Sequence, residues 1–117
     1  MKNYPDALVL FAAGNNGTHG LGTVGSPSTN KNGVCVGASL SSTDSFRAVS
    51  STSISSSYYH ETFMAGFSSR GPTDDGRLKP DVAAPGWYIN AAKAVGGATV
   101  GHCEVQNMRG TSMATPT

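Results

Sequence analysis

The stretch ALVLFAAGNNG, at residues 7–17, decides the fold. Its first seven residues are continuously apolar, and the four that follow are glycines and asparagines, which favour turns. A short apolar run that ends in turn residues is typical of a strand buried on both faces, as in a parallel sheet. We therefore predict a buried strand over 7–13 and a tight turn directly after it.

The same pattern of short apolar runs and turns recurs along the chain. Runs at 34–38, 81–85 and 88–92 predict three further short strands, the last two around a Pro-Gly turn. The glycine-rich segment 94–107 predicts a loop, and the residues after Gly110 are compatible with the start of a helix. The first two runs share the pattern of strands buried in a parallel sheet, whose crossovers need helices.

The segment 39–60 is low in complexity and rich in serine. We expect it to form either a surface excursion or a pair of polar-faced strands. No long amphipathic helix is evident in the sequence, so the chain lacks the helices that would cover both faces of a parallel sheet. We therefore expect these residues to be part of something larger.

Composition excludes several classes of protein. Glycine and proline make up 21 of the 117 residues, about 18%, against roughly 12% in average proteins. Charged residues make up only 13%, against about 25% in average proteins. Eight basic and seven acidic residues leave a net charge of +1, which argues against nucleic acid or an anionic membrane surface as a partner. No apolar run approaches the ~20 residues of a membrane span.

Two polar residues, a serine and an asparagine, lie in turns next to a regular element, where their side chains could take part in catalysis. Ser112 lies in GTSMA, a glycine turn before a possible helix, where free amides favour developing negative charge. Asn15 lies in the turn at the end of the first strand. Taken singly, such a serine is more often a helix cap and such an asparagine more often a turn residue.

Three blocks of sequence, taken together and in order, favour functional roles for these two residues. They are AAGNNG at 12–17, FSSRGP at 67–72 continuing as DGRLKPDVAAPG at 75–86, and GTSMATP at 110–116. In this order they resemble the oxyanion-asparagine, structural and nucleophile motifs of the subtilisin-like serine proteases, the subtilases. The resemblance spans nearly the whole chain and is weakest over 39–62 and 93–107. It implies the subtilisin-like α/β fold, a parallel sheet flanked by helices.

The resemblance also assigns roles to individual residues. Ser112 would be the nucleophile, and the Asn15 side-chain amide would form the oxyanion hole together with the Ser112 backbone N–H. Ala13 and Gly14 would line the pocket for the residue before the cleaved bond. The substrate would be a polypeptide, and the reaction needs no organic cofactor. Many subtilases bind calcium, but no metal site can be assigned to these residues.

The sequence departs from the family in what it lacks. The catalytic order of the family is aspartate, histidine, serine, and no segment resembles the aspartate or the histidine motif. We therefore expect residues 1–117 to be a partial catalytic domain, without the upstream Asp and His and without the helix after the serine. Alone it should be inactive, since the upstream part of the same domain is required. The alternative is an inactive, truncated homologue with a binding role or none.

Several residues imitate functional ones. The segment containing His19 superficially copies the histidine motif of the family, but it follows the asparagine block, where the family has a variable loop. His60 and His102 lie in the least similar segments, and we interpret them as loop residues. Cys35 is expected to be a buried thiol, although a bridge to Cys103 is possible in an oxidising compartment. The family implies an extracellular or vesicular location.

Overall fold

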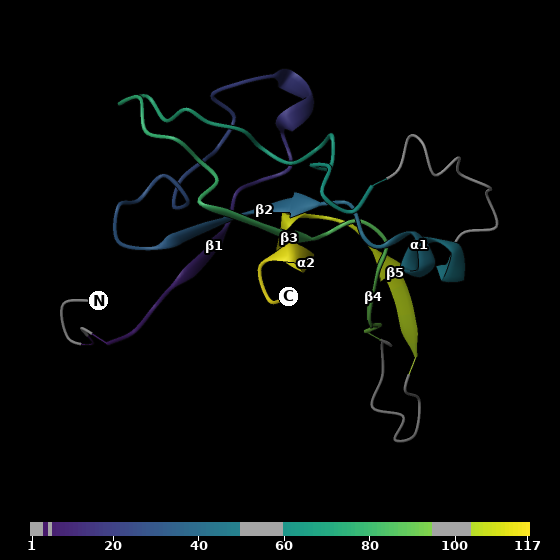
Figure 1. The fold of residues 1–117 in the computed structure, drawn as a ribbon. Coiled ribbons are helices and arrows are strands. Elements are labelled where there is room, and N and C mark those ends of the chain that lie inside the picture. The colour runs from purple at the N-terminus through teal and green to yellow at the C-terminus, as the bar shows by residue number, and fades with distance from the viewer. Residues whose placement is uncertain (1–3, 5, 50–59, 95–103) are drawn as a thin grey trace.

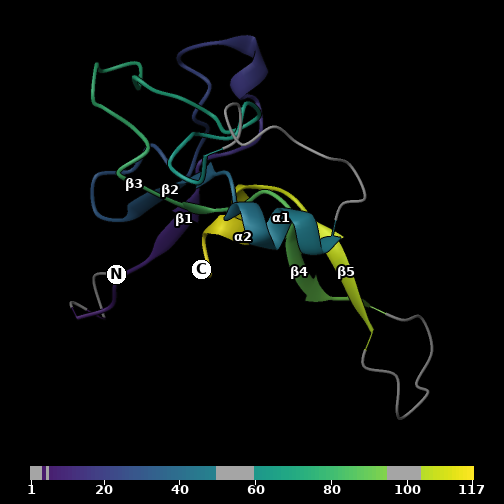
Figure 2. The same cartoon turned by 45° about the vertical axis from the view of Figure 1, so that its right-hand side comes forward.

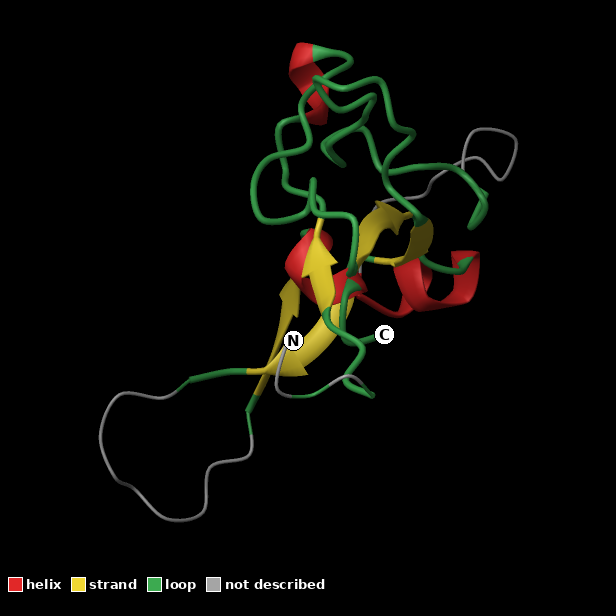
Figure 3. Cartoon of the chain, turned by 90° about the vertical axis from the view of Figure 1, so that its left-hand side faces the viewer, coloured by secondary structure: helices red, strands yellow, loops and turns green. Residues whose placement is uncertain are grey.

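The computed structural model describes residues 4, 6–49, 60–94 and 104–117, and its centre is a parallel sheet (Figure 1). The strands β1 (Leu10–Ala12), β2 (Val34–Ser39) and β3 (Val82–Pro85) lie in the order β1-β2-β3. Phe11 is in register with Cys35, and Gly37 with Ala83. All three strands are parallel, so their carboxyl ends lie at the same end of the sheet. The loops gather at one end of the sheet (Figure 3).

The remaining elements surround this sheet. A 3-10 turn, η1 (Gly17–His19), follows β1, and the helix α1 (Thr43–Val49) follows β2. The antiparallel strands β4 (Ile89–Ala92) and β5 (Val105–Met108) pair in a ribbon that projects away from the sheet (Figures 1 and 2). The last helix, α2 (Thr111–Ala114), packs against β2 and β3.

The core consists of small side chains. One cluster contains Val36, Ala38, Ala65 and Ala114, and so joins β2 to α2. Glycine at position 86 makes this close packing possible, because a Cβ there would lie 2.7 Å from the Ala38 Cβ. The approach of α2 to the sheet therefore depends on the absence of side-chain volume.

The predicted parallel α/β sheet is confirmed, with strands where the sequence places them, but the first strand differs in length and burial. In β1, regular strand pairing is limited to Leu10–Ala12, which lies within the strand predicted over residues 7–13. Leu8 is 69% and Leu10 44% exposed, so the expectation of burial on both faces is wrong for this end of the strand. In the described part of the chain β1 pairs with β2 alone, which leaves these leucines without a covering layer.

Two segments contain regular structure that differs from the expectation. Neither expectation for 39–60 included a helix, yet α1 occupies Thr43–Val49; residues 50–59 lie outside the described part. The predicted loop at 94–107 overlaps β5 (Val105–Met108), whose four residues pair with β4. Three of those four side chains are exposed, so an alternating apolar pattern is absent and the strand left no clear signal.

No helix of the described residues is long and apolar enough to cross a membrane.

A buried lysine and a carboxylate fasten β3 to β2. The Lys79 ammonium, on a side chain that is 5% exposed, donates to Asp81 Oδ2 over 2.6 Å. The same oxygen accepts a 2.7 Å hydrogen bond from the Cys35 backbone N–H. The Lys79 contact and then the Cys35 N–H lower the pKa of Asp81. The two contacts therefore favour the ionised form of this carboxyl group.

We expect Asp81→Asn to lower the free energy of unfolding by about 1–3 kcal/mol at neutral pH, because the buried Lys79 loses its counter-charge. Since the folded pKa of Asp81 is lowered, its stabilising effect is present above the unfolded pKa of about 3.9 and is lost as the pH falls through the folded value. Urea unfolding of both proteins between about pH 5 and about pH 2 tests this.

The difference in stability between the native protein and Asp81→Asn should narrow as the pH falls across that range. Asp44→Asn is the matched control. The Asp44 side chain is 96% exposed, and its ion pair with Arg47, at 3.9 Å, lies on the surface and contributes little to stability. A difference that stays constant down to the lowest pH would contradict this role of Asp81.

Candidate active site

Two segments far apart in sequence meet at the carboxyl end of β1. Asn15 follows the strand, in a turn that Gly14 enters with a φ of 105°. Ser112 is the second residue of α2, and Gly110 precedes the helix with a φ of 151°. The Gly110 N–H donates to the Gly86 carbonyl over 2.8 Å, which ties the start of α2 to the end of β3.

Thr111 connects the two segments. Asn15 Oδ1 accepts hydrogen bonds from the Thr111 backbone N–H at 3.0 Å and from Thr111 Oγ1 at 3.1 Å. Thr111 Oγ1 in turn accepts from the Gly14 N–H at 3.2 Å. Thr111 is 1% exposed, so these part-buried bonds connect a buried threonine to the exposed Asn15. Because Oδ1 is occupied, the orientation of the Asn15 amide is fixed.

This geometry leaves the NH₂ group of Asn15 unused. Among the described residues Asn15 Nδ2 donates no hydrogen bond, and Asn15 is exposed. The Ser112 N–H belongs to the first turn of α2, where backbone amides have no partner within the helix. Ser112 is also exposed. The arrangement therefore offers a hydroxyl and two N–H donors on adjacent segments, which is the chemistry that an oxyanion hole requires.

The middle block of sequence holds the asparagine turn in place. Ser69 Oγ accepts from the Asn16 N–H at 3.0 Å, and the Ser69 N–H donates to the Gly14 carbonyl at 2.9 Å. The Gly17 N–H donates to the Phe67 carbonyl at 2.8 Å. A Cβ at Gly14 would lie 2.9 Å from Ser69 Oγ. The glycines of the turn are therefore needed for its close approach to the 67–69 segment.

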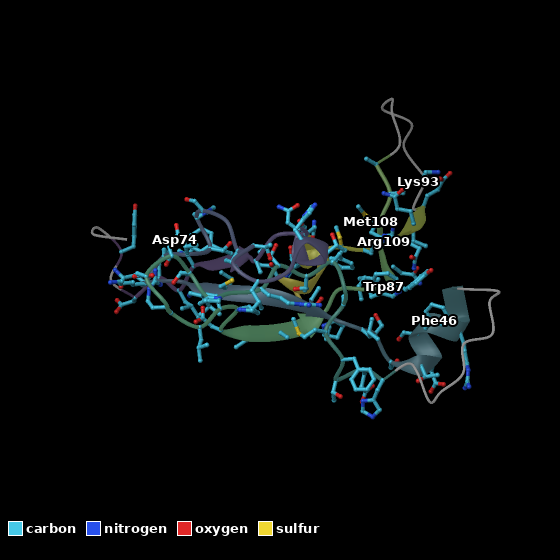
Figure 4. The ribbon with its side chains drawn as sticks, turned by 90° about the horizontal axis from the view of Figure 1, so that it is seen from above. Phe46, Asp74, Trp87, Lys93, Met108 and Arg109 are labelled. Atoms are coloured by element: carbon cyan, nitrogen blue, oxygen red, sulfur yellow. The ribbon has the colours of Figure 1, made fainter. Side chains whose placement is uncertain are left out.

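A hollow of about 460 Å³ opens beside these donors. Its lining comes from the asparagine turn, the middle block and the segment before α2: Asn15, Thr18, Gly66, Phe67, Trp87, Arg109 and Gly110. Figure 4 shows Trp87, Met108 and Arg109 close together, and Asp74 at the opposite end of the molecule. The hollow thus places an apolar surface and a cation directly next to the candidate oxyanion donors.

The other residues singled out by sequence lie elsewhere. Ala13 is 1% exposed and packs with Val24 and Cys35, and neither Ala13 nor Gly14 lines the hollow; their contact with substrate stays a prediction. His19 ends η1 as an exposed residue.

Neither His60 nor Cys35 lines the hollow. His60 bonds to Thr62 over 2.8 Å. Cys35 is a free, buried thiol whose pKa is raised by burial, while His102 and Cys103 lie outside the described residues.

Sequence reasoning missed Thr111 as a functional residue. Its position directly before Ser112 is visible in the sequence, but its three hydrogen bonds to the asparagine turn depend on residues about a hundred positions away. Arg109 and Trp87, which line the hollow, stand in no motif that marks them as site residues. A local motif does not indicate which side chains a distant segment will meet.

For the hydrolytic reaction proposed below, Thr111→Val should lower the kcat of the native protein, because it removes the hydroxyl that holds both Asn15 Oδ1 and the Gly14 N–H. We expect a loss of roughly tenfold in kcat with little change in KM, as for one net hydrogen bond used in the transition state. Thr111→Ser keeps the hydroxyl and should restore most of the rate. Equal rates for the valine and serine variants would show that Thr111 does not position Asn15.

Comparison with known proteins identifies the class. The family model described as "Subtilase family" matches residues 1–117, and the chain therefore belongs to the subtilases, a family of serine peptidases. The predicted family and fold are thus confirmed.

Individual relatives and solved structures agree with this assignment. Pyrolysin from Pyrococcus furiosus is 38% identical over 93% of this chain, which corresponds to 8% of pyrolysin. A structure titled "S41 Psychrophilic Protease" is 31% identical, with a TM-score of 0.58, and covers 93% of this chain. Sphericase is 28% identical, with a TM-score of 0.59 and the same coverage. This chain spans 30% of each of those two structures.

Proposed function

We propose that these residues are the nucleophile-bearing part of a subtilisin-like serine endopeptidase. Ser112 attacks the scissile carbonyl of a polypeptide, and the Asn15 side-chain amide and the Ser112 N–H bind the oxygen that becomes negatively charged. The observation that supports this most is the pair of hydrogen bonds from Thr111 to Asn15 Oδ1, at 3.0 and 3.1 Å. Within the described residues, Asn15 Nδ2 then has no acceptor and is available to a substrate, as is the exposed Ser112.

The proposed reaction proceeds in two steps. A histidine takes the Ser112 hydroxyl proton while Oγ adds to the carbonyl carbon, and an aspartate orients that histidine. The tetrahedral intermediate collapses, the proton passes to the leaving amine, and an acyl-enzyme ester remains. Water, deprotonated by the same histidine, then attacks the ester carbon. The second tetrahedral intermediate expels Ser112 Oγ, which takes the proton back from the histidine as the acid product leaves. Donors fixed in advance stabilise the charged intermediate more than the neutral substrate.

The base and its aspartate are proposed to come from outside these residues. No histidine in the described ranges is hydrogen-bonded to Ser112, and His60 is instead paired with Thr62. Without a base the serine is a weak nucleophile, so the 117 residues alone should not hydrolyse peptides. The same feature supports the alternative, an inactive homologue that retains Ser112 and Asn15 and has a binding role or none.

Labelling with a fluorophosphonate distinguishes the two functions. The probe would be added to native source material, and labelled peptides and their parent proteins identified by mass spectrometry. Trypsin cleaves after Arg109, so the diagnostic peptide begins at Gly110 and contains Ser112. Modification of Ser112 in the native protein would support the endopeptidase. Heat-denatured material is the control, since specific labelling requires the folded site.

An unlabelled Ser112 in native material would first require release of any inhibitory pro-segment by limited proteolysis. Absence of the label after that treatment would overturn the endopeptidase and favour the inactive homologue. Labelling of other serines at the same rate as Ser112 would also count against an activated nucleophile.

A further inference from the structure

The hollow beside Asn15 has an aromatic wall that is fixed before any ligand arrives. Phe67 and Trp87 stack with ring centroids 5.3 Å apart and an interplanar angle of 16°. Tyr88 meets Trp87 edge-on at 5.6 Å, and Phe46, which is 3% exposed, meets Tyr88 at 4.7 Å. The Ser41 hydroxyl also donates to the Trp87 carbonyl. This support fixes the wall, so a ligand does not need to order it.

Among the described residues that line the hollow, Arg109 alone is charged. Its guanidinium carbon lies 5.2 Å from the centre of the Trp87 ring, in a cation–π contact. Within the described residues, no carboxylate lies within ion-pair distance of Arg109: the neighbouring Glu104 on β5 is paired with Lys93 at 2.6 Å. Contact with the ring holds the cation at the hollow while its N–H donors have no anionic partner.

The hollow adjoins the reacting atoms of the proposed peptidase. Asn15, whose amide is a proposed oxyanion donor, is part of the lining, as is Gly110, two residues before Ser112. A substrate bound with its carbonyl oxygen at Asn15 therefore places a neighbouring side chain at or in the hollow. A volume of about 460 Å³ is ample for one side chain and adjoining backbone.

We propose that this hollow binds an acidic side chain, glutamate in the first instance, of a polypeptide substrate next to the cleaved bond, and that Arg109 determines this preference. The proposal rests on the proposed function. The methylene groups of the glutamate pack on Phe67 and Trp87, and its carboxylate accepts hydrogen bonds from the Arg109 guanidinium. A glutamine of the same size keeps the packing and loses the charge.

Fluorescence provides a direct test, because Trp87 is the single tryptophan of the 117-residue chain. Acetylated and amidated Ala-Glu-Ala, Ala-Gln-Ala and Ala-Lys-Ala peptides would be titrated into the native protein while its emission is recorded. The same titration of a Trp87→Phe variant is subtracted, which isolates the Trp87 signal from that of any other tryptophan. We expect saturable changes, with the Glu peptide bound roughly threefold to tenfold more tightly than the Gln peptide. Because Arg109 is exposed, the difference should shrink at high salt.

Variants assign the effect to Arg109. Arg109→Gln should abolish the preference for Glu over Gln, and Arg109→Glu should reverse it in favour of the Lys peptide. Arg70→Gln is the matched control, because Arg70 is an exposed arginine outside the hollow and should leave the preference intact. No saturable response, equal binding of Glu and Gln peptides, or a preference that survives Arg109→Gln would overturn the proposal.

Failure of this proposal and failure of the proposed function are separable. Fluorophosphonate labelling depends on Ser112 and its base, whereas Trp87 emission depends on occupancy of the hollow. A labelled Ser112 with equal binding of the three peptides would refute only the role of Arg109. Selective binding of the Glu peptide with an unreactive Ser112 would retain the acidic site and refute the peptidase.

Discussion

Replacement of Ser112 by alanine should abolish both fluorophosphonate labelling and peptide hydrolysis by the native protein. In a subtilisin, removal of the nucleophilic serine lowers kcat by about a million-fold, because the acyl-enzyme pathway is lost and only the oxyanion donors and binding groups remain. We expect a loss of the same order here. Ser112 is exposed on the first turn of α2, so the substitution removes one oxygen atom without disturbing the core.

The measurement needs a folded variant and a matched serine. Ser45→Ala is the control, because Ser45 is an exposed serine in α1 whose hydroxyl meets only Ser42 over 2.9 Å among the described residues. This variant should keep full activity and full labelling. Hydrolysis by Ser112→Ala at more than a few per cent of the native rate would assign the reaction to another nucleophile.

Asn15→Ala should have the second largest effect, because it removes the donor expected to contact the developing oxyanion. Loss of one such donor in a subtilisin lowers kcat by about 10²–10³-fold. We expect the same range in kcat with KM nearly unchanged, since the bond forms fully only in the transition state. Steady-state kinetics on a peptide substrate would separate the two constants.

Asn16→Ala controls for the turn itself. Asn16 is exposed, and within the described part its bond to Ser69 is made by the backbone N–H rather than by its side chain. This variant should retain most of the native kcat. A large rise in KM for Asn15→Ala with kcat unchanged would place Asn15 in ground-state binding, and it would leave the oxyanion role unsupported.

Much of the fold was predictable from sequence because its signals are local. The three parallel strands are short apolar runs next to turn residues, and each occurs where its pattern indicates. By contrast, α1 lies in a serine-rich segment and β5 carries exposed side chains. Their stability comes from partners such as the Tyr88 ring against Phe46 and the pairing of β4 with β5, which a local pattern does not reveal.

The candidate site likewise combines residues that a local motif indicates with residues whose roles depend on distant partners. Asn15 and Ser112 stand in recognisable motifs, so a family resemblance suffices to propose them. Thr111 and Arg109 are next to a motif residue, but their roles are set by what lies across from them, an amide oxygen and an indole ring. Such contacts become visible only when the two segments are in place.

The separation of 96 positions between Asn15 and Thr111 also has a consequence for the order of events during biosynthesis. At ribosomal rates of 5–20 residues per second, the asparagine turn precedes its threonine partner by roughly 5 to 20 seconds. Closing so long a loop also carries an entropic cost that local structure does not. The proposed hydrolytic apparatus would therefore be incomplete on a nascent polypeptide, which delays any proteolytic hazard to the cell until translation has passed the nucleophile.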